Sequence, residues 1–139
     1  MKIIHMALNI IIALLLLMGF FAFGPVIESR FFPVYSKFQL TSAVPTDDGN
    51  TRAIFTFTKF RNCAPQGFAF FNGELGNAFY QVTTRVQGGP DTRARPLGTQ
   101  ESYPYELVGI TPEDLATTVF AEIYSHCHSL WLTRTKVYP

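Results

Sequence analysis

The sequence has little net charge and no cluster of one sign. It carries 11 Lys and Arg residues against 10 Asp and Glu residues, so the formal charge at pH 7 is +1. A protein that binds nucleic acid through its phosphates needs a basic patch or stripe, and the sequence offers none. No polybasic run that would hold anionic lipid follows the apolar N-terminal segment. We therefore expect no nucleic-acid partner.

The sequence also lacks the motifs of known enzymes and cofactor sites. It contains no glycine-rich phosphate loop, no nucleophile motif and no complete set of metal ligands. No internal repeat is present either. These absences predict a protein without catalysis and without a cofactor.

The longest uncharged run covers residues 6–23 and contains one polar side chain, Asn9. As a helix with a rise of about 1.5 Å per residue, this run would be roughly 27 Å long, close to the hydrocarbon thickness of a bilayer. A domain this small could hardly surround a helix that is apolar on every face, which argues against a buried core helix. We therefore expect a transmembrane anchor in residues 1–24.

Two fates of this segment fit its composition: a cleaved secretory signal and a retained signal anchor. The run is longer than the about 7–15 residues of a cleavable signal, and Pro25 would follow the only cleavage-like triplet. Proline at that position disfavours cleavage, so we expect retention. Lys2 precedes the run, while Glu28 and Arg30 cancel after it, which predicts a cytoplasmic N-terminus and a periplasmic or extracellular domain.

The rest of the chain is interpreted as a juxtamembrane linker, residues 25–33, and one β domain, residues 34–139. Period-two alternation predicts seven strands, at residues 34–44, 51–63, 67–71, 78–86, 103–110, 117–128 and 131–138. The apolar parity shifts between Phe57 and Phe60, which predicts a bulge near Lys59. Thr111 followed by Pro112 predicts one helical turn before the sixth strand.

The domain has two cysteines, Cys63 and Cys127. An even number of cysteines in an exported domain predicts a disulfide between them. Two free thiols are the alternative, and they would be expected if the domain faced the cytoplasm.

The number, order and spacing of the strands resemble the immunoglobulin and fibronectin type III superfold, an antiparallel β-sandwich. In that order Cys63 ends the second strand and Cys127 ends the sixth. Those strands run the same way in opposite sheets, so both sulfurs would reach one end of the sandwich. The sequence departs from the antibody pattern, because its only tryptophan is Trp131 and because Ser125 stands at the tyrosine-corner position. An unrelated sandwich of seven or eight strands is the alternative.

Three short motifs also resemble a group of uncharacterised single-span membrane proteins of bacteriophages and proteobacteria. The motifs are RNC at 61–63, RPLG at 95–98 and HCHSLW at 126–131. The resemblance implies a phage-encoded envelope protein. The group has no established activity, so it implies no catalytic residue.

His126 and His128 form the sharpest local pattern. On a strand they would share one face with Cα atoms roughly 7 Å apart, which suits two imidazoles on one metal. The sequence names no third ligand, and the alternative is that both rings pack on the outer face beside Trp131. A nucleophilic pair of Cys127 with a histidine would need a free thiolate, which the predicted disulfide removes.

Residues 87–102 are rich in Gly and Pro and fit neither period, which predicts the longest loop of the domain. Arg93 and Arg95 in this loop could bind an anionic ligand or partner, with a simple sheet-to-sheet crossover as the alternative. Together with Trp131 they are the candidate partner-binding residues. The function expected from the sequence is binding of an envelope protein by a membrane-anchored domain. The alternative is a periplasmic domain that binds a metal or small ligand through His126 and His128.

Overall fold

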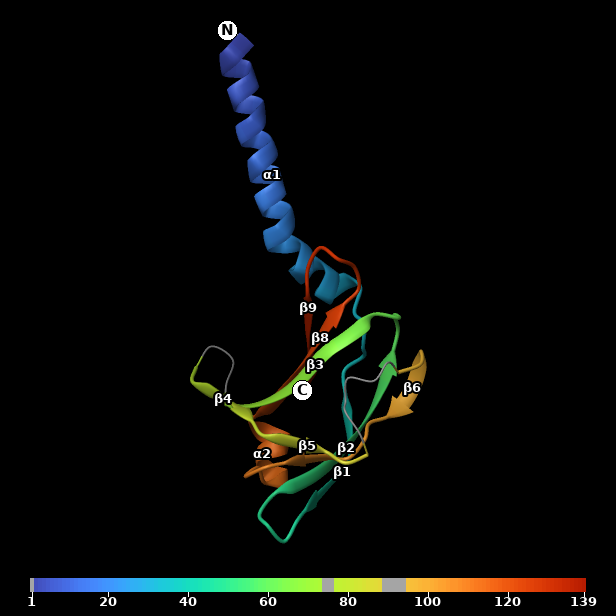
Figure 1. Ribbon diagram of the computed structural model, residues 1–139. Helices are drawn as coiled ribbons and strands as arrows, with labels where there is room; N and C mark the ends of the chain where they lie inside the picture. Colours follow the sequence, from blue (N-terminus) through green and yellow to red (C-terminus); the bar gives the residue numbers. More distant parts are fainter. Residues whose placement is uncertain (1, 74–76, 89–94) are drawn as a thin grey trace.

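A computed structural model describes residues 2–73, 77–88 and 95–139 of the chain (Figure 1). It consists of a long N-terminal helix that projects from a mainly β domain. The domain contains two antiparallel sheets that face one another.

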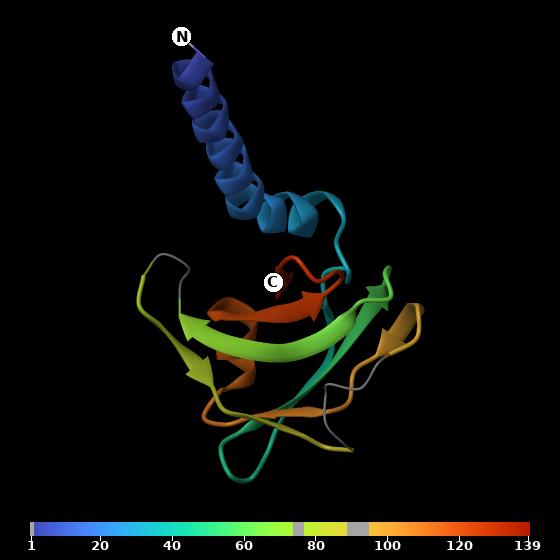
Figure 2. The same ribbon diagram turned by 45° about the horizontal axis from the view of Figure 1, so that its top comes forward.

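Helix α1 spans Lys2–Phe31 and is long and apolar enough to cross a bilayer. The mean hydropathy of an 18-residue window is 2.7, and the rest of the chain buries none of that window. The helix continues through Pro25, so most of the predicted linker is helical. Figure 2 shows the helix bending in its C-terminal third, as expected where proline removes a backbone donor and crowds the preceding turn.

The first sheet, sheet A, has the strand order β1-β2-β7-β5, and β6 pairs with β2 beside β7. Its strands are β1 (Gln39–Pro45), β2 (Thr51–Lys59), β5 (Thr84–Val86), β6 (Gly98–Glu101) and β7 (Tyr105–Leu107). The turn between β1 and β2 places Gly49 at φ 75°, a left-handed backbone conformation that glycine adopts without strain.

The second sheet, sheet B, has the strand order β4-β3-β8-β9. Its strands are β3 (Ala64–Gly73), β4 (Phe79–Val82), β8 (Val119–His126) and β9 (Thr133–Tyr138). The predicted sixth strand begins later than expected, because helix α2 (Pro112–Thr117) precedes β8.

Aromatic side chains from both sheets fill the space between them. Phe38 stacks on Phe57 and Phe68 with ring centroids 4.5 and 5.6 Å apart, and Phe55 lies 5.7 Å from Phe70. Burying each such ring contributes roughly 1.5–3 kcal/mol. The alternating burial of β2 is the pattern expected for a strand with one face on a core.

Helix α2 closes one end of the core. Thr111 accepts the backbone N–H of Asp114, and the Asp114 carboxylate accepts the backbone N–H of Thr111, which confirms the predicted cap. Leu115 is fully buried, and its carbonyl accepts the Tyr138 hydroxyl at 2.9 Å. Figure 1 places α2 and the β1–β2 turn at the end of the domain opposite α1.

The number of strands differs from the prediction for two reasons. Residues 78–86 form two strands rather than one, because the chain leaves sheet B after Val82 and joins sheet A at Thr84. Thr83 lies at the crossing, where its carbonyl accepts the Val108 N–H at 3.0 Å. The predicted loop at 87–102 ends in strand β6, which pairs with the last residues of β2. The described residues therefore contain nine strands where seven were predicted.

The predicted bulge near Lys59 is wrong. Strand β2 keeps its register with β6 through Lys59, and the inward position after Phe57 is Lys59 itself, which is 1% exposed. Its Nζ donates to the carbonyl of Arg95 at 2.8 Å, and burial lowers the pKa of the amine. Phe60 follows as an exposed residue, so the parity shift in the sequence marks a buried lysine.

The disulfide between Cys63 and Cys127 is confirmed, with Cα atoms 4.5 Å apart. The predicted bridge between opposite sheets is wrong. Ala64 pairs with His126 in the β3–β8 ladder, so the two cysteines continue that ladder by one residue within sheet B. A Cα distance near 4.5 Å is typical of neighbouring positions on antiparallel strands that are not hydrogen bonded.

Candidate functional site at the helix–domain junction

The end of α1 contacts the β8–β9 loop and the start of β9 (Figure 2). The carboxylate of Glu28 lies at the centre of this junction, and the residue is 7% exposed. A glutamate this deeply buried needs hydrogen-bond donors around it.

Four side chains surround the Glu28 carboxylate. Oε1 accepts Nη1 of Arg61 at 2.9 Å. Oε2 accepts Nε1 of Trp131 at 2.8 Å and the hydroxyl of Thr133 at 2.7 Å. Nε2 of His128 lies 3.1 Å from the same oxygen. These partners come from the β2–β3 connection, the β8–β9 loop and β9, so one side chain joins the helix to three parts of the domain.

The environment of Glu28 favours its charged form. Burial by itself raises the pKa of a carboxyl group, but the hydrogen bonds from Thr133, Trp131 and Arg61 outweigh that effect. Together with His128 they lower the pKa of Glu28 from 4.5 to about 2. Glu28 lies beyond the apolar run, so the charge is held where the helix leaves the predicted span.

Trp131 connects the junction to the apolar part of the helix. Its ring lies edge-on to Phe20 and Phe21, with centroids 5.1 and 6.2 Å apart. A Cβ atom on Gly24 would lie 2.6 Å from the Trp131 ring, so only glycine allows this approach. Phe20, Gly24 and Glu28 are spaced four residues apart and therefore share one helix face.

Arg61 also closes the end of the helix. Its Nη1 donates to the carbonyl of Phe32 at 2.9 Å as well as to Glu28. Carbonyls after the last helical turn lack partners within the helix, and a guanidinium group satisfies and stabilises them. The neighbouring Cys63–Cys127 disulfide tethers the β2–β3 connection to the β8–β9 loop, so Arg61 and His128 are held close together.

The two histidines of the predicted pair have different surroundings, because His126 is an exposed residue at the end of β8 and His128 contacts Glu28. Strand β8 ends at His126, so the alternation that would align the two rings stops before His128. Nδ1 of His128 accepts the N–H of Leu130 at 3.2 Å, which assigns Nε2 as the donor to Glu28. Among residues 2–73, 77–88 and 95–139, no group of three His, Cys, Asp or Glu side chains could hold a metal ion. Metal binding by His126 and His128 stays an untested prediction.

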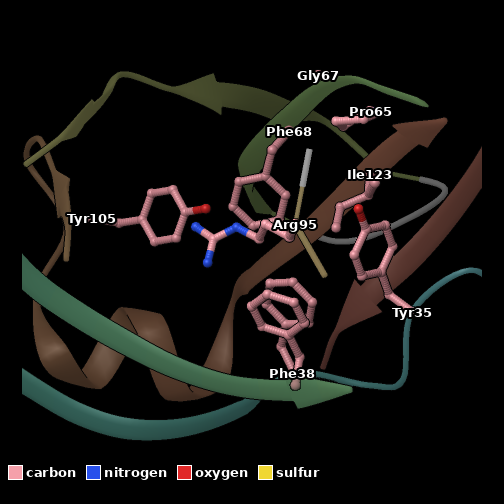
Figure 3. Close-up of a pocket in the computed structure, with 9 residues that line it drawn as sticks. Tyr35, Phe38, Pro65, Gly67, Phe68, Arg95, Tyr105 and Ile123 are labelled. Atoms are coloured by element: carbon pink, nitrogen blue, oxygen red, sulfur yellow. The ribbon is translucent and has the colours of Figure 1, made fainter. Parts of the chain in front are cut away.

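Arg93 lies outside the described residues, while Arg95 packs over aromatic rings. The guanidinium of Arg95 lies 4.7 Å from the centroid of Tyr103 and 5.5 Å from that of Phe57, and its Nη1 donates to the Glu101 carbonyl. Figure 3 shows it pointing toward Tyr105 across a cavity of about 20 Å³. That volume holds about one water molecule, so the cavity is too small for an organic ligand.

The outer face of sheet B carries a cluster of three aromatic side chains, in which Phe79 is exposed, Phe71 is half-buried and Phe120 is buried beneath them. Phe71, Phe79 and Phe120, which we call the aromatic patch, have ring centroids 5.2–5.6 Å apart. Nζ of Lys136 lies 5.4 Å from the Phe120 centroid, and Phe79 is 46% exposed.

An ion pair between the buried Glu122 and the exposed Arg134 lies farther along the same face. Nε and Nη2 of Arg134 each donate to the Glu122 carboxylate at 2.6 Å, and the Tyr124 hydroxyl donates to it at 3.0 Å. Burial, together with the hydrogen bond to Glu122, raises the pKa of Tyr124.

Comparison with known proteins assigns neither a family nor a function to the chain. No family model matches the chain, and searches of curated proteins and of solved structures found no match. The function must therefore be argued from the junction and the surface.

Glu28 is the residue that the sequence interpretation missed. The sequence showed it only as a charge that cancels Arg30, and its partners lie 33 to 105 positions away. The four-residue intervals between Phe20, Gly24 and Glu28 were the one available signal, because they placed an acid on the same helix face as a small residue and an aromatic ring.

Proposed function

We propose that the chain is a single-pass membrane protein whose β domain binds a protein partner at the bacterial cell envelope, without catalysis. The observation that carries this proposal is the Glu28 junction. Four donors around one buried carboxylate hold the domain in one orientation on the end of an apolar helix. A domain that presents a surface beside a membrane benefits from such a fixed orientation.

The junction also supports retention of the helix. Trp131 packs on Phe20 and Phe21, so cleavage before Pro25 would strip these rings from the domain. Intact-mass measurement of the membrane-extracted protein tests this, and we expect the full 15.6 kDa. A mass that corresponds to a chain starting near Pro25 would contradict the anchor.

The strand order supports an immunoglobulin-like architecture. The orders β1-β2-β7-β5 and β4-β3-β8-β9 parallel the A-B-E-D and C′-C-F-G orders of immunoglobulin-like sandwiches. The in-sheet disulfide departs from the antibody pattern, so the likeness is one of topology. Such sandwiches serve many unrelated functions, and the partner must be argued from the surface.

The disulfide supports an exported domain. Disulfides persist in oxidising compartments such as the bacterial periplasm and are rare in the cytosol. With Lys2 ahead of the span, this favours a cytoplasmic N-terminus and a periplasmic or extracellular domain. The motifs at 61–63, 95–98 and 126–131 favour a phage-encoded protein, which inspection of the neighbouring genes would test.

The aromatic patch is the surface that best suits a protein partner. Aromatic side chains and arginine are enriched in protein interfaces, and the patch lies on the same sheet face as the Arg134–Glu122 pair. Arg95 and Trp131 both have contacts within the chain, and their predicted role in partner binding stays untested.

Site-specific photo-crosslinking in intact cells tests the proposal. A photoreactive residue at Phe79 should give a discrete adduct with an envelope protein. The matched control is Val44, which is 54% exposed on β1. An adduct at Val44 alone would show that binding occurs elsewhere on the domain, and the absence of adducts at both positions would overturn the proposal.

A further inference from the structure

The end of the domain beside α1 carries exposed apolar side chains from three separate parts of the chain. We call this set the membrane-proximal rim, and its members are between 40% and 67% exposed: Phe31, Phe32, Phe60, Leu130 and Leu132. Isolated exposed apolar residues are normal, but a group gathered at one end marks an interaction surface.

The contacts around the helix end bring these segments together. Arg61 donates to the Phe32 carbonyl, which places Phe60 beside the end of α1. Leu132 lines a hollow with Pro25, Val26 and Ser29 of the helix. Leu130 lies between His128 and Trp131 in the β8–β9 loop, which Figure 2 shows in red beneath the helix end.

The depth of Trp131 shows how close this loop comes to the predicted span. Its ring contacts Phe20 and Phe21, which belong to the apolar run at 6–23. At about 1.5 Å per residue, Phe20 lies roughly 4–5 Å inside the C-terminal end of that run. A ring that touches Phe20 is therefore level with the boundary between hydrocarbon and headgroups.

The Glu28 junction prevents the rim from turning away from this boundary. The side chains that hold Glu28 flank the rim in sequence, because Arg61 follows Phe60 and because His128 and Trp131 bracket Leu130. The helix therefore fixes both the height and the direction of the rim. Arg30 is exposed at the same level, where phosphate groups would lie.

We propose that the β domain itself sits on the bilayer, with the membrane-proximal rim and Trp131 inserted among the lipid headgroups. Tryptophan and phenylalanine side chains suit this layer, and tryptophan is enriched there in membrane proteins. The proposal rests on the membrane anchor of the proposed function and adds a second contact made by the domain. It directs α2 and the β1–β2 turn away from the membrane and leaves the aromatic patch at the side.

Quenching of tryptophan fluorescence by brominated lipid tests the proposal on the full chain. Trp131 is the only tryptophan, so the unmodified protein in phosphatidylcholine nanodiscs reports directly on its own depth. We expect stronger quenching by lipid brominated near the glycerol end of the acyl chain than by lipid brominated near the terminal methyl group.

Three variants, each combined with Trp131→Phe, place the probe elsewhere. Leu130→Trp puts it on the rim, and Leu15→Trp puts it in the middle of α1. Val44→Trp puts it near the end of β1, next to the β1–β2 turn that lies at the opposite end of the domain. Leu130 and Val44 are matched in exposure, at 53% and 54%. In nanodiscs of lipid brominated near the glycerol end of the acyl chain, we expect the Leu130→Trp variant to lose most of its tryptophan fluorescence and the Val44→Trp variant to lose none.

The Leu15→Trp variant separates the two proposals. If it is quenched while neither Trp131 of the unmodified protein nor the Leu130→Trp variant is quenched more than the Val44→Trp variant, the domain does not sit on the bilayer although the anchor stands. Trp131 of the unmodified protein is included because Trp131→Phe removes one donor to Glu28. If the Leu15→Trp variant is not quenched, the helix is not in the bilayer, and both proposals are overturned.

Discussion

Replacing Glu28 by glutamine should loosen the domain from the helix that carries it. The variant keeps the size of the side chain but removes the charge that Arg61 pairs with, and it replaces one acceptor oxygen by an amide donor. In either orientation of the amide, its NH2 group faces a donor: it meets Arg61 when it takes the Oε1 position, and it meets Trp131 and Thr133 when it takes the Oε2 position. Breaking a buried, charge-assisted cluster of this kind costs about 2–3 kcal/mol.

The pKa of Glu28 gives an independent magnitude and a pH dependence. A fall from 4.5 to about 2 on folding corresponds to about 3 kcal/mol of stability. Because the folded-state pKa is the lower one, this stability is present above pH 4.5 and is lost as the pH falls toward 2. The wild-type protein should therefore lose stability over this range, and the Glu28→Gln variant should lose less.

The assay is thermal unfolding of the full chain in nanodiscs at neutral pH and at steps down to pH 2, followed by Trp131 emission. At neutral pH we expect the variant to melt on the order of 10 °C below the wild type. Glu101→Gln is the control, because this residue is exposed and its side chain has no hydrogen bond within the described part of the chain, and we expect a change within about 0.5 kcal/mol. Equal melting temperatures for wild type and Glu28→Gln, or parallel pH profiles, would refute the argument.

Three further changes probe other parts of the structure. Cys127→Ser opens a bridge between cysteines 64 positions apart and should lower the free energy of unfolding by about 4 kcal/mol, measured by thermal unfolding. Gly24→Ala should displace Trp131, since its Cβ would lie 2.6 Å from the ring, and the displacement should shift the emission maximum. Ser125→Ala removes a buried hydroxyl for which the described residues provide no hydrogen-bond partner, so it should raise stability by about 1 kcal/mol in the same unfolding assay.

Each of these changes has its own control or contrary outcome. Reduction of the wild-type protein should reproduce the effect of Cys127→Ser, and an unchanged melting temperature in both would refute it. Gly19→Ala is the matched control for Gly24→Ala, because a Cβ atom on Gly19 would meet no described neighbour within 4 Å, and equal spectra for the two variants would contradict the close approach. A lower melting temperature for Ser125→Ala would mean that its hydroxyl has a partner, such as a bound water.

Local patterns in the sequence were enough to predict the parts of the molecule that depend on near neighbours. The run at 6–23 predicts an exposed apolar helix because composition alone decides how a helix partitions between water and lipid. Thr111 followed by Pro112 predicts the start of α2 because a helix cap and its partner lie within one turn of each other. The alternation at residues 51–63 predicted a strand with two different faces, and the structure buries Phe55 and Phe57 on one of them.

Tertiary contacts decided the rest, because the groups involved lie far apart in the chain. From the sequence, Glu28 would be expected to be an exposed acid after the apolar run, and only the fold brings Arg61 and Thr133 to it. The sequence likewise predicted a bulge near Lys59, and only the fold shows that its amine is buried and donates to the Arg95 carbonyl. The pairing of the two cysteines followed from their number, but its place within one sheet followed from the β3–β8 register. Burial of a charge depends on donors and acceptors that only the folded chain assembles, and no local period in the sequence encodes them.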